Sequence, residues 1–84
     1  MNKKYNVQLI IPLLYKIYDI LLPINITISE AILIIKKSIN KLNKDTFNHD
    51  NNLFLYNSLN GEKYNLEQYV YDTSIKNGSI LILC

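Results

Sequence analysis

The residues best suited to chemistry lie in one loop and at one end of the chain. His49, the only histidine, stands between Asp45 and Asp50, and Cys84 is the only cysteine. A transition-metal site usually combines several His or Cys ligands, and nucleophilic catalysis needs a base held against its nucleophile. This Asn-rich loop meets neither requirement, and it lacks the spacing and glycine of a calcium-binding EF-hand loop. We therefore expect no metal, no cofactor and no catalytic residue, and we expect Cys84 to act as a small apolar residue at a strand end.

Lysine supplies all of the fixed positive charge. The nine Lys exceed the acidic residues by two, and the sequence contains no Arg, the residue on which bidentate recognition of bases and phosphates relies most. Lys36, Lys37, Lys41 and Lys44 cluster where they suit the negative end of a helix dipole. We expect a solvated helix end there, and no nucleic-acid partner.

The length of 84 residues indicates one domain, residues 1–84. The apolar run that starts at Val7 is interrupted by Pro12 and Lys16, and no small-residue cleavage site follows it. Its length is also far below the roughly 20 residues that cross a membrane. We expect a cytoplasmic, unprocessed protein without direct membrane insertion.

A helix over residues 28–42 organises the other elements. Thr27 and Glu30 have the spacing of a capping box, in which each side chain bonds to a free backbone N–H of the first turn. Leu33 lies on the opposite side of this helix from its apolar stripe and is expected to be exposed. The stripe is about 100° wide and predicts the core-facing side; it consists of Ile28, Ala31, Ile32, Ile35, Ile39 and Leu42.

Five strands are expected beside this helix. Residues 7–11 and 18–22 flank a short turn, and residues 79–84 form a continuously apolar strand of the kind that has neighbours on both sides. Residues 53–56 are apolar on both faces, so the pattern leaves open which face meets the helix, and residues 63–66 are a short polar edge strand. Two Asn-Gly turns, and a helical turn between residues 67 and 74, connect the later elements. The fold class is α+β: a mixed sheet of about five strands, with the first and last strands at its centre and one helix on one face.

This order of elements resembles ubiquitin, that is, the β-grasp fold. The likeness is carried by residues 27–30 with the helix stripe, and by residues 72–83, where an apolar residue and a polar turn lead into the last strand. Within that superfamily the chain is most similar to the small bacterial YukD-like proteins associated with type VII secretion. The second strand with its terminal Pro23, the turn at Asn77-Gly78 and the end of the chain at that last strand carry this second likeness.

The resemblance implies a non-enzymatic protein-interaction module, a cytosolic accessory of a type VII-like secretion system. Ubiquitin conjugation and the related sulfur carriers act through a flexible C-terminal Gly-Gly, whereas this sequence stops at Leu83-Cys84. Two alternatives stay open. One is a degenerate sulfur carrier or conjugated modifier, and the other is a self-associating structural domain, for which a weak homodimer is possible.

Alternation along the strands predicts an apolar face on the side of the sheet away from the helix. The residues expected to face the helix are Val7, Leu9, Tyr18, Ile20, Leu22, Leu81 and Leu83. Ile10, Leu21, Ile80 and Ile82 must then point outward, where no second helix remains to cover them. A contiguous apolar patch on a small domain usually marks an interaction site, so we expect a protein partner to dock on these four residues. A general drift of the composition toward Ile is the alternative explanation.

Overall fold

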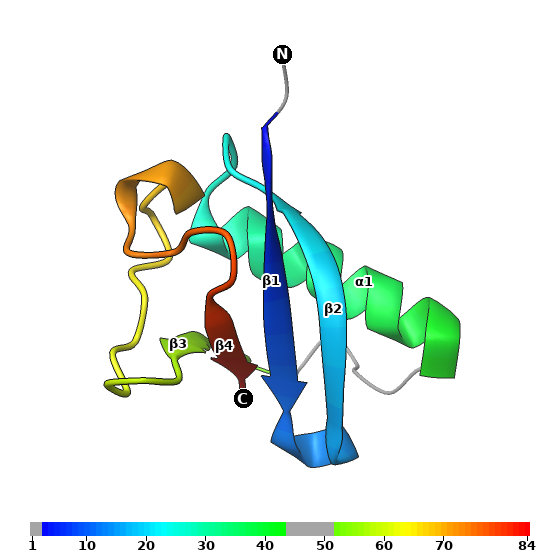
Figure 1. The fold of residues 1–84 in the computed structure, drawn as a ribbon. Coiled ribbons are helices and arrows are strands. Elements are labelled where there is room, and N and C mark those ends of the chain that lie inside the picture. Colours follow the sequence, from blue (N-terminus) through cyan, green and yellow to red (C-terminus); the bar gives the residue numbers. More distant parts are fainter. Residues whose placement is uncertain (1–2, 44–51) are drawn as a thin grey trace.

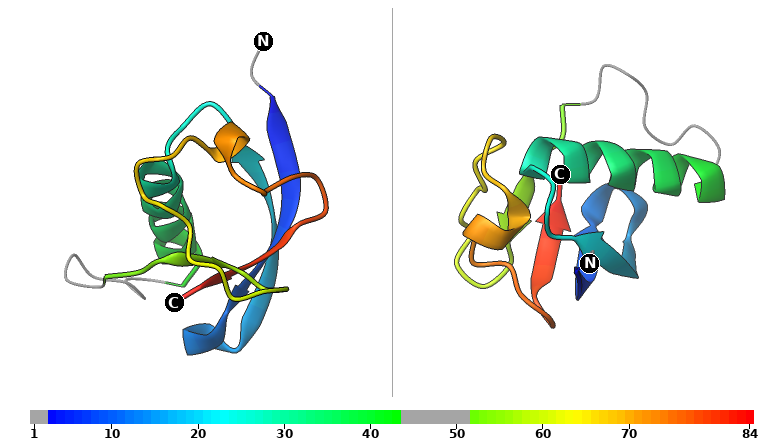
Figure 2. Two further views of the ribbon diagram at one scale, coloured as in Figure 1. Left: turned by 90° about the vertical axis from the view of Figure 1, so that its left-hand side faces the viewer. Right: turned by 90° about the horizontal axis from the view of Figure 1, so that it is seen from above.

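The computed structural model describes residues 3–43 and 52–84. It has two layers, a sheet and one helix that covers one of its faces (Figures 1 and 2). Asp45, His49, Asp50 and Lys44, considered above, lie outside the described residues. The elements in chain order are β1 (Lys4–Ile11), η1 (Pro12–Leu14), β2 (Lys16–Pro23), α1 (Ile28–Asn43), β3 (Leu55–Asn57), η2 (Val70–Asp72) and β4 (Ile80–Leu83).

The sheet has the strand order β2-β1-β4-β3. β1 and β4, from opposite ends of the chain, are parallel central neighbours, and each has an antiparallel partner on its other side. This confirms the predicted central pair. The turns at Asn60-Gly61 and Asn77-Gly78 place each glycine at positive φ, +74° and +87°, a conformation that glycine adopts without a Cβ clash.

The start of α1 is fixed by the predicted capping box. The Thr27 N–H donates to Glu30 Oε1 at 3.0 Å, and the Glu30 N–H donates to Thr27 Oγ1 at 3.2 Å. Hydrogen bonds from the backbone and the hydroxyl of Thr27 hold the pKa of Glu30 below its usual value. Because these hydrogen bonds are stronger to the ionised carboxylate than to the neutral acid, the charged form of Glu30 stabilises the helix start more.

The core lies between α1 and the inner face of the sheet. Five of the six predicted stripe residues are buried, and the predicted inward residues of β1, β2 and β4 are buried or half-buried against them. Val70 and Ile75 close one end of the core from the loop before β4. The prediction for Leu42 was wrong, since this side chain is 70% exposed. A 16-residue helix is about 24 Å long, while four strands span about 14 Å, so the last turn extends past β2 (Figure 1).

The sheet has four strands within the described residues, and the predicted strand at residues 63–66 is not among them. Lys63 makes a single bridge to Tyr56, after which the chain leaves the sheet. The carbonyl groups of Leu66 and Gln68 instead accept hydrogen bonds from Ser29 N and Ile28 N, at 3.0 and 2.8 Å. These bonds satisfy free N–H groups of the first turn of α1, so this segment hydrogen-bonds to the helix and does not form a further strand of the sheet. The third strand also lies at residues 55–57 rather than 53–56.

Candidate protein-binding surface

The outer face of the sheet carries a row of apolar side chains that crosses all four strands. Ile10 of β1 is the register partner of Ile17 on β2 and of Ile82 on β4, and Ile82 is the partner of Tyr56 on β3. We call these four residues the outer row; with strands about 4.8 Å apart, it spans about 14 Å. Side chains opposite one another on neighbouring strands are in reach of contact. The row is therefore one continuous strip, and no described element packs over it (Figure 2).

The four residues proposed from the sequence do not all belong to this strip. Ile10 and Ile82 are in the outer row, and Ile80 adjoins it on β4, with 39% of its surface exposed. Leu21 lies opposite Asn6 at the other end of the hairpin, and the pair Gln8–Asp19 separates it from the Ile10–Ile17 pair. The structure thus brings Ile10, Ile80 and Ile82 together and leaves Leu21 exposed among polar residues.

The surface continues beyond the outer row toward the carboxyl end of β4. Phe54 and Cys84 exchange two backbone hydrogen bonds of 2.8 and 3.1 Å, which extends the β3–β4 ladder by one further pair. The ammonium of Lys63 lies 3.7 Å from the centre of the Phe54 ring, a cation–π contact. Cys84 is exposed and is a free thiol. This end of the outer face is therefore apolar with one positive charge beside it.

The tip of the β1–β2 hairpin is the second apolar end of this surface. Leu13 and Tyr15 are exposed there, Tyr15 to 96%, and Ile17 follows with 65% of its surface exposed. Tyr15 has φ 53° and ψ 40°, the left-handed conformation, and its N–H donates to Pro12 O at 3.0 Å to close the turn. A bulky residue is uncommon in this conformation. Tyr15 therefore adopts a costly backbone conformation without burying its ring.

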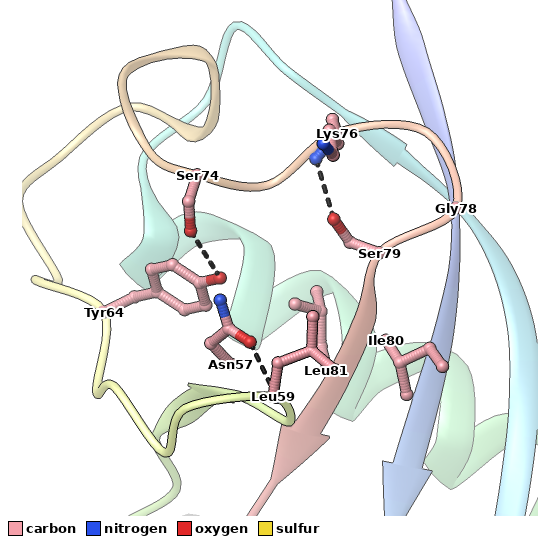
Figure 3. Close-up of a pocket in the computed structure, with 9 residues that line it drawn as sticks. All are labelled: Asn57, Leu59, Tyr64, Ser74, Lys76, Gly78, Ser79, Ile80 and Leu81. Carbon is pink, nitrogen blue, oxygen red and sulfur yellow. Dashed lines mark hydrogen bonds between the residues drawn. The ribbon is translucent and has the colours of Figure 1, made fainter.

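A hollow of about 300 Å³ lies beside Ile80, between β4 and the loops around it (Figure 3). Three hydrogen bonds lie among its polar groups: Tyr64 Oη is 3.0 Å from Ser74 Oγ, Asn57 Oδ1 accepts a bond of 2.8 Å from Leu59 N, and Ser79 Oγ accepts one of 2.9 Å from Lys76 N. This volume is at the lower limit for small-molecule pockets. No two of these described groups form an acid–base or nucleophile–base pair.

No group of three or more His, Cys, Asp or Glu side chains in residues 3–43 and 52–84 is placed to hold a metal ion. Over the same ranges, no helix has the length and apolar character to cross a membrane.

One member of the outer row, Ile17, was not predicted from the sequence, and the face of a second, Tyr56, was left open. Lys16 and Ile17 were left outside the second strand because a turn was expected to continue through Lys16, but the strand resumes at Lys16 after the single left-handed residue. The alternation of Ile17, Asp19 and Leu21 was the signal that could have placed Ile17. Tyr56 faces outward because Leu55 is the buried residue of β3, a choice that the pattern left open.

Comparison with known proteins identifies the fold. No family model matches the chain, and no curated protein does. Among solved structures, the ubiquitin-like domain of the Mycobacterium tuberculosis type VII secretion system protein EccD1 superposes with a TM-score of 0.69 at 18% identity, over 95% of this chain and 96% of that one. A chain of an ESX-5 inner membrane complex gives 0.70 at 12% identity, over 98% of this chain and 21% of that one.

The fold is therefore ubiquitin-like, a β-grasp, as the resemblance predicted. A chain of toluene 4-monooxygenase in complex with an inhibitor reaches a TM-score of 0.72 at 5% identity, over 95% of each chain. Since a chain of an enzyme complex matches as well as a secretion component does, the fold alone decides no function. A proposal about function must therefore rest on the residues of the outer sheet face.

Proposed function

We propose that this chain is a non-enzymatic protein-interaction module that binds a protein partner through the outer face of its sheet. The observation that carries the proposal is the outer row, a continuous apolar strip on the side of the sheet away from α1. In this row Ile17 is exposed and Ile10, Ile82 and Tyr56 are half-buried; a contiguous apolar patch on a small monomeric domain usually marks an interaction site. The hollow beside Ile80 and the exposed hairpin tip extend the same surface.

The wider context that we propose is a cytoplasmic accessory role in a type VII-like secretion system of a bacterium. Its support is the likeness in fold to the EccD1 domain and to a chain of an ESX-5 inner membrane complex. The YukD-like character inferred from the sequence fits the same context. A degenerate sulfur carrier, a conjugated modifier and a self-associating domain are the competing functions.

The test is capture of partners by the tagged protein from its own cells, followed by mass spectrometry. In the variant Ile10→Ser/Ile82→Ser, two adjacent apolar residues of the outer row become polar, and we expect the specific partners to be lost. Leu33→Ser is the matched control, because Leu33 is 53% exposed on α1, in the other layer. Circular dichroism must show that both variants keep the fold. Partners retained by the double variant would refute the site, and captured proteins unrelated to secretion would refute the wider context.

A further inference from the structure

Within residues 3–43 and 52–84, one edge of the sheet is covered by another segment and the other edge is open. At the β3 edge, Leu55 O accepts a bond of 2.9 Å from Tyr64 N, and Asn57 N donates to Glu62 O at 2.8 Å. The segment before Tyr64 thus covers β3. The opposite edge is β2, with eight residues the joint longest strand, and no described segment pairs with its outer side.

The open backbone groups of β2 can be assigned from its register. Just beyond the strand, Ile24 N donates to Lys3 O at 3.2 Å, which makes this a hydrogen-bonded pair. Such pairs alternate along an antiparallel ladder, so the even-numbered residues of β2 bond to β1. The N–H and C=O groups of Ile17, Asp19 and Leu21 therefore point away from the sheet. The side chains of the same three residues lie on the outer face and are exposed.

We propose that a protein partner adds an extended strand to β2, and that this strand sets apolar, basic and apolar side chains opposite Ile17, Asp19 and Leu21. The proposal rests on the proposed function, because it names the kind of partner segment and where it binds. In strand addition, main-chain hydrogen bonds supply affinity and alternate side chains supply specificity. Here the free main-chain groups and the pattern apolar–acidic–apolar belong to the same residues. Residues at every second position of the added strand meet them.

The charge pattern favours a different chain over a second copy of this one. Two copies that join their β2 edges about a twofold axis must pair residues of the outer face with one another. The register with full overlap then places Asp19 against Asp19, and like charges directly opposite are destabilising. Registers shifted by two residues place each Asp19 against Ile17 or Leu21 instead. Lys16 belongs to the other face of β2, so no such register gives Asp19 a cationic partner.

The experiment uses a display library of extended peptides about nine residues long, randomised at three alternate central positions. The baits are the native protein and Asp19→Lys. We expect the native protein to select apolar–Lys/Arg–apolar peptides and the variant to select apolar–Asp/Glu–apolar peptides. Each selected peptide should bind the wrong bait roughly twofold to tenfold more weakly, the size expected for a cross-strand charge pair and its reversal.

Amide hydrogen exchange locates the peptide. Addition of a selected peptide should slow exchange at Ile17, Asp19 and Leu21, and Ile17→Pro, which removes one outward N–H without touching the β1 ladder, should weaken binding. The proposal is overturned by the absence of selection, by selection that ignores residue 19, or by protection of β2 that grows with protein concentration alone, the sign of a second copy. Capture through Ile10 and Ile82 reports separately on the proposed function, since neither residue is on β2.

Discussion

Replacement of Tyr15 by Asn should stabilise the fold and weaken partner capture. The backbone of Tyr15 is left-handed, at φ 53° and ψ 40°, a conformation that costs a non-glycine residue on the order of 1 kcal/mol or more. Asn occupies this region several-fold more often than other residues do, which corresponds to a gain of about 0.5–1 kcal/mol. Because the ring is 96% exposed, its removal forfeits almost no buried surface.

For a domain of this size, that gain raises the melting temperature by about 2–8 °C. Tyr15→Val is the matched control, since a β-branched residue fits the left-handed region worst, and it should lower the melting temperature. The melting temperature of Tyr15→Gly should be close to that of Tyr15→Asn. Glycine removes the cost of the left-handed conformation, but the extra chain entropy that it adds to the unfolded state offsets this gain by about 0.5–1 kcal/mol. All three variants keep the turn hydrogen bond, which uses the backbone N–H of residue 15.

The functional half of this prediction follows from the position of the ring beside Ile17. A side chain that costs stability and buries nothing contributes nothing to the fold, whereas exposed tyrosine is a favoured residue in protein interfaces. The Tyr15→Asn variant should therefore show lower partner capture together with a higher melting temperature. A melting temperature unchanged by both Tyr15→Asn and Tyr15→Val would show that the turn does not hold residue 15 in this conformation. Undiminished capture by the stabilised variant would exclude Tyr15 from the binding surface.

Three further predictions concern the core, the helix start and the chemistry. Ile35→Ala should lower the free energy of unfolding, measured with denaturant, by about 2–5 kcal/mol, because it opens a cavity in the middle of the buried stripe. The control Leu33→Ala, on the exposed side of the helix, should lower it by less than about 0.5 kcal/mol. Equal effects of the two variants would contradict the packing of α1 on the sheet. Glu30→Gln should destabilise the protein at neutral pH only. The folded-state pKa of Glu30 is depressed, so the stability that its carboxylate contributes is present above the unfolded-state pKa and disappears as the pH falls through the folded-state value. A difference between the unfolding curves of the native protein and the variant that persists in strong acid would argue against the capping box. Intact-mass measurement of the protein from its own cells should show the unmodified chain, and a C-terminal thiocarboxylate or an isopeptide-linked adduct would establish the carrier or modifier function instead.

The helix, the two central strands and the turns were predictable because each has a local signal. The capping box at Thr27 and Glu30, the helical spacing of the stripe and the two Asn-Gly turns all depend on residues close together in sequence. The short strand expected at residues 63–66 was wrong for a reason that no local signal carries. The carbonyl groups of Leu66 and Gln68 are taken by the first turn of α1, almost 40 residues earlier in the chain.

For the candidate surface, the alternation of residues along each strand predicts only part of the arrangement. Alternation assigns a face to each residue, and it correctly gave Ile10, Leu21, Ile80 and Ile82 the outward face. It does not say which outward residues lie side by side, because that depends on the register between strands. The register separates Leu21 from the others and brings in Ile17.

The register also gives the two halves of the outer face different characters. Toward the start of β1 most outward residues are polar, Asn6 and Gln8 with Asp19 beside them, and the Asn6 N–H donates to Asn77 Oδ1 at 2.8 Å. Toward the carboxyl end of β4 the face is the outer row, bounded by Phe54 under the ammonium of Lys63. A general enrichment in Ile would scatter apolar residues over both halves. Leu21 and Ile80 are apolar residues of the polar half, but only in the other half do all four strands contribute to a single strip, the pattern expected of a surface selected for binding.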